Sequence, residues 1–469
     1  MQTPYLIGFI TATILLPLAA FILLGLLLVL GFRPSERKVA WLIRASIFGA
    51  LLSLLPVAYT FAESGFRPRF IPAGDFFALP GYRFALGFIL DTPSLSMAAL
   101  TLTLAAFVAR FSQSYMHQER GFSRYFALLA LFTGAMLLTV FAATYDQLFI
   151  GWELVGLTSA FLIAFFHHRN GPVRAGLRVF ITYRISDIGL LLSAAGMHHH
   201  LAINHIPLPG ELSEAVVHNL SPSVLTLLAL GIAIAAMGKA AQLPLGGWLP
   251  RAMEGPTPSS AIFYGGLSVH AGIYLLIRSY PIFERAPIVQ GVLIATGAAT
   301  FIYASIVVRA QTDAKSSLAH ATMAQLGLMV VFVGFGLTRI ALVHLCAHAI
   351  VRTWQLLRAP NLFREASDIH AALSATGPAP LLSRPARSLF LYRAALARFS
   401  IDSLTERYLL YPLIALGRLL ENFERRLDAR LCGFSEPLPV AEAPPDEAYE
   451  SAEVPEPTKQ AQKNVEHRP

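Results

Sequence analysis

Long apolar runs separated by short polar segments cover most of the first 358 residues. Each run is about 18–25 residues long, enough to cross a hydrocarbon core of about 30 Å as a helix. We therefore predict an all-α polytopic membrane protein with about eleven transmembrane helices. They are expected near residues 5–31, 42–62, 88–109, 125–143, 147–166, 177–196, 223–243, 257–279, 287–308, 316–337 and 340–358.

The composition supports the membrane class, because 55% of the 469 residues are hydrophobic and only 14% are charged. The formal charge of +8 could suggest nucleic-acid binding, but the arginines sit at the ends of apolar runs, where they anchor helices at the headgroups. No nucleic-acid motif is present. We expect a multi-pass protein of the cell (inner) membrane in contact with the lipid bilayer.

Basic residues in the short loops predict the orientation. With the N-terminus outside, twelve fall in inner loops and six in outer loops, which makes the C-terminus cytoplasmic. The inner set is Arg33, Arg37, Lys38, Arg110, Arg120, Arg124, Arg169, Arg174, Arg178, Arg251, Arg309 and Lys315. The outer set is Arg67, Arg69, Arg83, Arg278, Arg285 and Arg339.

The chain changes character after residue 358, which suggests three regions. Residues 1–358 form the membrane domain, residues 359–433 an amphipathic partner-binding region, and residues 434–469 a disordered acidic, proline-rich tail. Within residues 384–432, apolar residues at helical spacing alternate with arginines, as in helices on the inner membrane surface. Pro412 is expected to kink or break this run. A twelfth span through Tyr408 to Leu420 stays open.

Glu153 and Lys239 lie within apolar runs, where an ionisable side chain costs roughly 2.5–3.5 kcal/mol on insertion scales. Such residues usually mark an ion or proton path, although a structural ion pair is the alternative. Pro244, Gly246 and Gly247 follow Lys239, so we predict at least one broken helix there. A break in the membrane requires protein or a water-filled cavity around it.

Further polar residues recur at helical spacing. Arg184 and Asp187 are three apart and can pair, as a structural pair or as part of a path. His344, His348 and Arg352 recur every four residues and therefore share one helix face. No third metal ligand accompanies the two histidines, and the chain has only two cysteines. We expect no metal, no cofactor and no catalytic site in this chain, so whether it is an enzyme is left uncertain.

The segments GWELVGLTSAFLI, GKAAQLPLGGWLPRAMEGPTP, DAKSSLAHATMAQLG and HLCAHAIVR resemble the proton-conducting antiporter-like subunits of respiratory complex I and of Mrp-type antiporters. LDTPSLSMAALTLTLAAFVARFSQSYM also resembles the third span of that family. The resemblance implies a proton path. It places the path on Glu153, Lys239, Arg184, Asp187, Lys315, His344, His348 and Arg352, and we add His270 and His320 as candidates.

Three departures from the family pattern stand out. Tyr264 occupies a position where the family has a histidine, and tyrosine does not titrate near neutral pH. His270, six residues on, could replace it, although an ideal helix would point it elsewhere. Arg352 replaces a lysine and is effectively always protonated. The family usually continues after residue 357 through a second broken helix, so the fold is expected to be a truncated antiporter-like one.

AFFHHRNGPVRAGLRVFITYRISD and SSAIFYGGLSVHAG resemble the DabB-type membrane subunits of bacterial inorganic-carbon accumulation systems. That resemblance implies a cytoplasmic, zinc-containing partner of the DabA type, in which CO2 hydration to bicarbonate is driven by cation flow. A subunit of a complex I-like or Mrp-like NADH dehydrogenase or antiporter is the alternative. The coupling ion, H⁺ or Na⁺, stays open.

Overall fold

The structure is a computed structural model that describes residues 3–79, 82–200, 205–209, 221–311, 313–359, 392–401 and 405–431. Eleven helical spans in these ranges are long and apolar enough to cross a membrane, which confirms the prediction. Ten of them are α1 (Thr3–Val29), α2 (Glu36–Glu63), α3 (Thr92–Tyr115), α4 (Phe122–Phe141), α5 (Tyr145–Ile163), α6 (Asn170–His200), α8 (Pro222–Lys239), α13 (Pro287–Val307), α14 (Ala314–Gly334) and α15 (Thr338–Arg358).

The remaining span, Thr257–Arg278, is composite. It consists of α10 (Thr257–Ser260), a π-helical segment (Ala261–Gly266) and α11 (Ser268–Arg278). Every residue of its apolar window is buried inside the protein, so this span is the centre of the helix bundle. It packs against α3, α8, α14 and α15.

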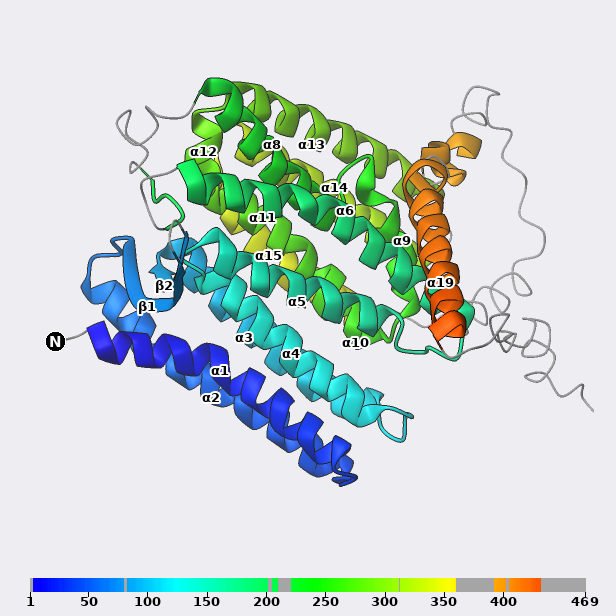
Figure 1. The fold of residues 1–469 in the computed structure, drawn as a ribbon, viewed down its shortest axis with the longest axis horizontal. Helices are drawn as coiled ribbons and strands as arrows, with labels where there is room; N and C mark the ends of the chain where they lie inside the picture. Colours follow the sequence, from blue (N-terminus) through cyan, green and yellow to red (C-terminus); the bar gives the residue numbers. More distant parts are fainter. Residues whose placement is uncertain are drawn as a thin grey trace, which may run out of the picture. The chain divides into compact units, whose positions relative to one another are not determined.

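The other spans pack largely in neighbouring pairs. Contacts join α1 with α2, α4 with α5, α6 with α8, and α13 with α14 (Figure 1). Three of these pairs require glycine, including α4 with α5, where a Cβ on Gly151 would lie 2.7 Å from the Thr139 amide nitrogen. A Cβ on Gly189 would lie 2.5 Å from the carbonyl oxygen of Gly231, and one on Gly297 would lie 2.7 Å from that of Gly327. Small residues of this kind allow membrane helices to approach closely.

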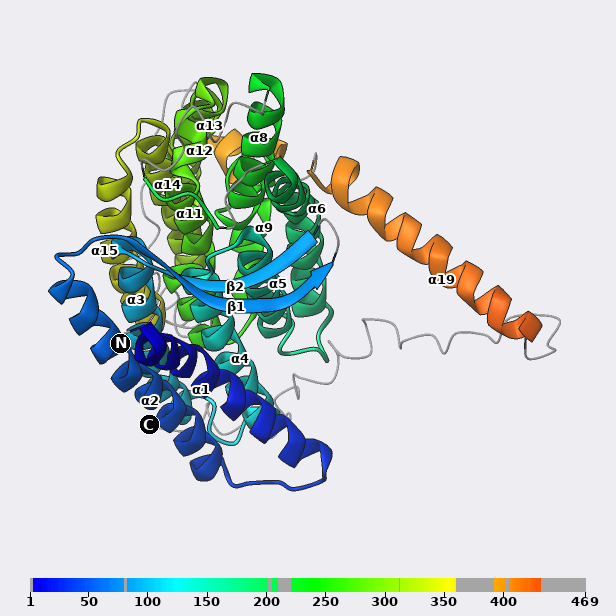
Figure 2. The ribbon, with the colours of Figure 1, turned by 60° about the vertical axis from the view of Figure 1, so that its left-hand side comes forward.

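A two-stranded antiparallel hairpin, β1 (Arg69–Leu79) and β2 (Tyr82–Leu90), connects α2 to α3. It lies at the end of the bundle where α1 begins (Figures 1 and 2). The third span was predicted to begin at residue 88, but residues 88–90 belong to β2. Asp91 then caps α3, accepting a hydrogen bond from the Ser94 amide, and so fixes the start of the helix at Thr92.

The predicted break after Lys239 is present. α8 ends at Lys239, and Ala241 adopts the left-handed backbone region with φ of 51°. The chain re-enters helical structure at Leu245–Gly247 and continues as α9 (Trp248–Arg251). Hydroxyl groups satisfy part of the freed backbone, since the Leu243 amide donates to Thr300 Oγ1 over 3.0 Å.

Connecting elements are short. α12 (Tyr280–Glu284) and single turns at Ala252–Glu254, Val308–Ala310 and Arg398–Ser400 link longer helices, and a π-helical turn, Glu406–Leu410, precedes α19 (Tyr411–Leu431). Pro412 is therefore the second residue of α19. The chain divides into two compact units, Met1–Leu410 and Tyr411–Pro469.

α19 is amphipathic and is not among the eleven candidate spans of the described residues. The predicted tail at 434–469, and 360–391 of the predicted partner-binding region, lie outside the described residues. The domain boundary at 358, the cytoplasmic position of α19 and the membrane orientation remain predictions.

Candidate functional site

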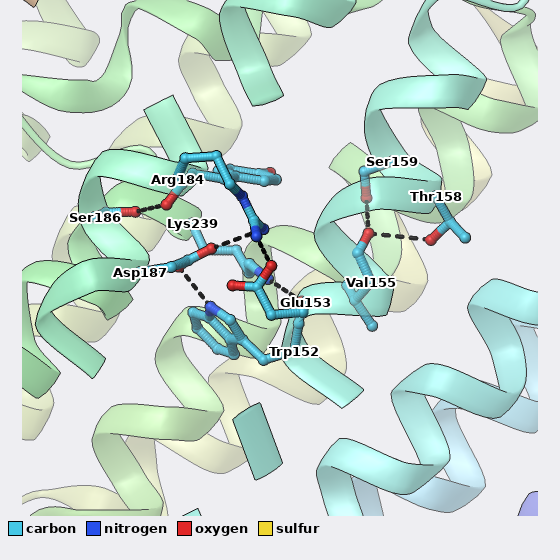
Figure 3. A network of polar contacts seen from close by, with 10 residues as sticks. Trp152, Glu153, Val155, Thr158, Ser159, Arg184, Ser186, Asp187 and Lys239 are labelled. Carbon is cyan, nitrogen blue, oxygen red and sulfur yellow. Dashed lines mark hydrogen bonds and ion pairs between the residues drawn. The ribbon is translucent and has the colours of Figure 1, made fainter. Parts of the chain in front are cut away.

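Four of the predicted polar residues form one network between α5, α6 and α8 (Figure 3). Arg184 forms an ion pair with Glu153 and lies 3.3 Å from Asp187 Oδ2. One guanidinium is therefore shared by two carboxylates from different helices. Asp187 is almost fully buried, whereas the Glu153 and Arg184 side chains keep 19% and 36% exposure, so the network has one partly open side.

Lys239 lies at the end of α8 with no exposed surface. Its Nζ donates to the Trp152 carbonyl oxygen over 2.7 Å and stands 3.9 Å from the Trp152 ring centroid and 5.1 Å from that of Tyr183. Burying an isolated ammonium costs several kcal/mol. The carbonyl, the two aromatic faces and the nearby Asp187 charge offset that cost.

Trp152 was not among the predicted site residues, yet it connects the network. Its Nε1 donates to Asp187 Oδ1 over 2.6 Å, while its carbonyl accepts from Lys239 (Figure 3). The sequence shows that Trp152 directly precedes Glu153. No local sequence pattern, however, distinguishes a tryptophan that bonds to a carboxylate from one that only fills a core. Gly156, one turn after Trp152, packs closely on Tyr183: a Cβ there would lie 3.2 Å from the Tyr183 ring, closer than an ordinary contact.

A second cluster joins α11 to α15. His270 Nε2 lies 2.9 Å from His348 Nδ1, and both rings are buried. An ideal helix would have pointed His270 elsewhere. The π-helical segment, followed by Leu267 at φ −128°, changes the rotational phase of the span before His270 is reached. This corrects the expectation from regular helical spacing.

His344 and Arg352 flank that pair on α15, as the four-residue spacing predicted. His344 Nε2 lies 3.0 Å from Gln325 Oε1, and its ring centroid is 6.2 Å from that of His348. Arg352 is buried and close enough for its charge to act on both His270 and His348. Within the described residues, His348 Nε2 and Arg352 Nε have no protein hydrogen-bond partner.

Hydroxyl and aromatic side chains lie between the two clusters. Ser159, on the helix of Glu153, is 3.2 Å from Ser268, two residues before His270. Trp248 packs on both Tyr183 and Tyr264, with ring centroids 5.1 and 5.6 Å apart. The buried Tyr264 hydroxyl has no hydrogen-bond partner among the described residues. Buried polar atoms of this kind are commonly bridged by water.

Lys315 and His320 occupy the first turns of α14. Lys315 is half-buried, whereas His320 is buried with Nδ1 2.8 Å from the Ser316 carbonyl oxygen. Because a carbonyl oxygen only accepts, His320 Nδ1 is the donor in this hydrogen bond.

The position of Arg278 differs from the one predicted from the loop charges. It was counted among the outer-loop arginines, but it is 5% exposed and forms an ion pair with Asp91 at the start of α3. Its second guanidinium nitrogen lies 3.1 Å from the Tyr274 hydroxyl, which donates to the Val140 carbonyl. An arginine that ends an apolar run resembles a headgroup anchor, and its partner is 187 residues away, so sequence offered no local signal.

Among the described residues, no three His, Cys, Asp or Glu side chains are placed to hold a metal ion. The two clusters are built from ammonium, guanidinium, carboxylate and imidazole groups. Such an arrangement can hold and pass protons or attract a cation. The role of each residue remains a proposal.

Comparisons with known proteins agree on the fold. A family model described as NADH:quinone oxidoreductase/Mrp antiporter, transmembrane, matches residues 142–377, and one for the N-terminus of complex I chain 5 matches residues 76–126. A solved structure of the Mrp complex from Dietzia sp. is similar with a TM-score of 0.63 and 24% identity, over 86% of this chain and 47% of that chain.

Two curated relatives are quinone oxidoreductase subunits. NAD(P)H-quinone oxidoreductase chain 5 of Synechocystis sp. is 34% identical over 65% of this chain and 44% of the relative. NADH-ubiquinone oxidoreductase chain 5 of Bos indicus is 32% identical over 72% of this chain and 54% of the relative. The chain thus spans about half the length of the curated relatives it matches.

Proposed function

The chain belongs to the NADH:quinone oxidoreductase/Mrp antiporter family of membrane proteins, and on that premise we propose that it is a cation-conducting, energy-coupling subunit of a membrane complex. Protons are the favoured ion, because the site is built from titratable groups. The observation that carries the proposal is the network of Glu153, Arg184, Asp187 and Lys239 within the membrane spans.

The shared guanidinium suggests how the network responds to a proton. While Glu153 is ionised, Arg184 divides its charge between Glu153 and Asp187. A proton arriving on Glu153 removes one of the two carboxylates, so Arg184 moves toward Asp187. A cation closer to Asp187 disfavours a second positive charge on Lys239 and drives its proton onward. Arg184 itself stays charged throughout.

Onward transfer would run from Lys239 toward His270 and His348. The side chains of Ser159, Ser268 and Tyr264 supply hydroxyls between the clusters, and bridging water completes the route. Arg352 is effectively always protonated and is therefore a poor carrier, so its role on this route is that of a fixed positive charge.

The test is Glu153→Gln in inside-out vesicles that contain the assembled complex. The amide keeps the shape of the side chain and removes its titration, so cation-driven pH change is expected to fall below detection while the protein still inserts. Glu63→Gln is the control, because Glu63 is an exposed carboxylate at the end of α2. Normal activity of Glu153→Gln would contradict the proposed path.

We further propose that the chain works with a cytoplasmic zinc protein of the DabA type, in which cation flow drives CO2 hydration to bicarbonate. The resemblance of residues 164–187 and 259–272 to DabB-type subunits supports this assignment. α19 adds a candidate surface for the partner, since it exposes Leu416, Leu420 and Phe423 beside basic residues such as Arg418 and Arg426.

Purification of the full chain from its native membrane tests this assignment. A co-purifying zinc protein, retained when the tail after residue 436 is removed but lost when residues 411–431 are deleted, is the expected result. The second candidate is a subunit of a quinone oxidoreductase or Mrp-like antiporter, with which the similarity to quinone oxidoreductase subunits is equally consistent. Recovery of hydrogenase-like quinone-reducing subunits instead would support that alternative.

A further inference from the structure

The C-terminal strap, defined here as residues 398–401 and 405–410, returns to the membrane helices after α15. It contacts the interrupted segment after Lys239 and three helices, α6, α9 and α13. These contacts lie within the first compact unit, which ends at Leu410, and α19 begins at the next residue.

The first contact is to the break itself. Thr405 Oγ1 lies 3.2 Å from the Pro244 carbonyl oxygen and 3.1 Å from that of Ile401, so its one proton is shared between the two acceptors. The amide of the preceding residue, Leu243, is held by Thr300 on α13. The hydroxyls of Thr300 on α13 and of Thr405 on the strap therefore bond to two neighbouring residues of the interrupted segment.

Glu406 provides the second and third contacts. Its carboxylate forms an ion pair with Arg178 on α6 and lies 3.2 Å from Arg251 at the end of α9. Arg178 precedes Arg184 by six residues, about 9 Å along the helix axis. The Arg178 and Glu406 side chains are only 12% and 18% exposed, so solvent screens this pair less than a surface pair.

The start of the strap is also restrained. Arg398, Phe399 and Ser400 all have φ between 51° and 55°, a left-handed conformation that L-residues disfavour. Tyr303 on α13 donates to the Arg398 carbonyl over 3.4 Å and packs on the Phe399 ring at a centroid distance of 6.0 Å. A backbone held in such a conformation is a common feature of functional segments.

We propose that the strap is a positioning device for the proposed conduction site: Thr405 and Glu406 fix the interrupted segment after Lys239 and the helix that carries Arg184 and Asp187. The inference rests on the proposed function. Thr405 and Glu406 are positioning residues, and neither touches Lys239.

Hydrogen exchange on the purified full chain tests the strap without any conduction assay. Thr405→Val removes one hydrogen bond at nearly constant volume, and Glu406→Gln removes the charge. Each is expected to raise amide exchange of residues 240–251 about tenfold, while exchange of α2 stays constant. Glu421→Gln is the matched control, because Glu421 is an exposed carboxylate on α19 paired with Arg425. Unchanged exchange in both strap variants overturns the proposal.

Conduction in the assembled complex is the second readout. Glu406→Gln is expected to lower cation-driven pH change about tenfold, and Glu406→Asp, which keeps the carboxylate, to restore most of it. Exchange that rises without any loss of conduction overturns the positioning role. If the wild-type complex shows no cation-driven pH change, the proposed function is contradicted. The hydrogen-exchange result then still tests whether the strap holds the interrupted segment.

Discussion

His270 Nε2 and His348 Nδ1 lie 2.9 Å apart in the buried centre of the bundle, although 78 residues separate them in the chain. One ring must donate to the other, so the pair holds a proton between two helices. The π-helical segment Ala261–Gly266 makes this meeting possible, because it turns α11 relative to α10. Tyr264, which stands where the family pattern has a histidine, lies in the same span six residues before His270.

His270→Asn tests this pair. Asparagine can still hydrogen-bond to His348, but it does not protonate, so we expect cation-driven pH change to fall at least about tenfold with the fold retained. His117→Asn is the control, since His117 is an exposed histidine bonded to Glu36. Equal activity of the two variants would remove His270 from the path.

Lys239→Met is expected to abolish conduction, because methionine fills a similar volume without a charge or a proton. Insertion and thermal stability should be preserved or improved, since a buried ammonium is removed. Lys38→Met, at an exposed lysine of α2, should behave as wild type. Flux measured by a pH-sensitive dye in vesicles, with expression level as the control, distinguishes loss of function from loss of protein.

Trp152→Phe separates the hydrogen bond that the indole donates to Asp187 from the contact of the aromatic ring with Lys239. The ring face toward Lys239 and the backbone carbonyl remain, but the 2.6 Å bond to Asp187 is lost and its carboxylate is left less satisfied. We expect a three- to tenfold loss of conduction, about 1 kcal/mol, typical of one hydrogen bond. Trp41→Phe, at an exposed tryptophan of α2, is the reference. A full loss would mean that the indole does more than orient Asp187.

Asp91→Asn probes the buried ion pair with Arg278. Asparagine caps a helix about as well as aspartate, so the variant removes the charge and keeps the start of α3. An uncompensated buried arginine should cost about 3–5 kcal/mol, seen as a lower unfolding temperature. Asp313→Asn, at the cap of α14, isolates the capping effect and should change stability by less than about 0.5 kcal/mol. Equal shifts in the two variants would contradict the role assigned to Arg278.

Apolar run length predicted the number and order of the spans, because a membrane leaves few ways to satisfy a backbone within it. The break after Lys239 was also predictable from Pro244 and the glycines that follow. Glu153 and Lys239 could be chosen as site residues from the sequence because charged side chains inside a membrane span are rare. That the structure joins both residues to one network supports this interpretation, and their roles are still to be tested.

Three features were not predicted from the sequence, for different physical reasons. The first is the strand at residues 88–90, which is apolar like the span that follows, and only the polar segment Asp91 to Ser94, a helix-start signal that we did not use, marks the boundary. The Asp91 to Arg278 pair depends on tertiary packing across 187 residues. The phase change at Ala261–Gly266 comes from a π-helical segment whose residues, apart from two glycines, are ordinary for a membrane helix.

The complete burial of the Thr257–Arg278 span has a consequence for biogenesis. This segment is synthesised before α14 and α15, against which it packs. Part of its surface is therefore uncovered until those two helices have been made. Its earlier neighbours α3, α5 and α8 are already available, and Asp91 can neutralise Arg278 at once. The face of the π-helical segment that contacts α15 is covered only when α15 has been made. Among the described spans, α15 is therefore the last to pack against this one.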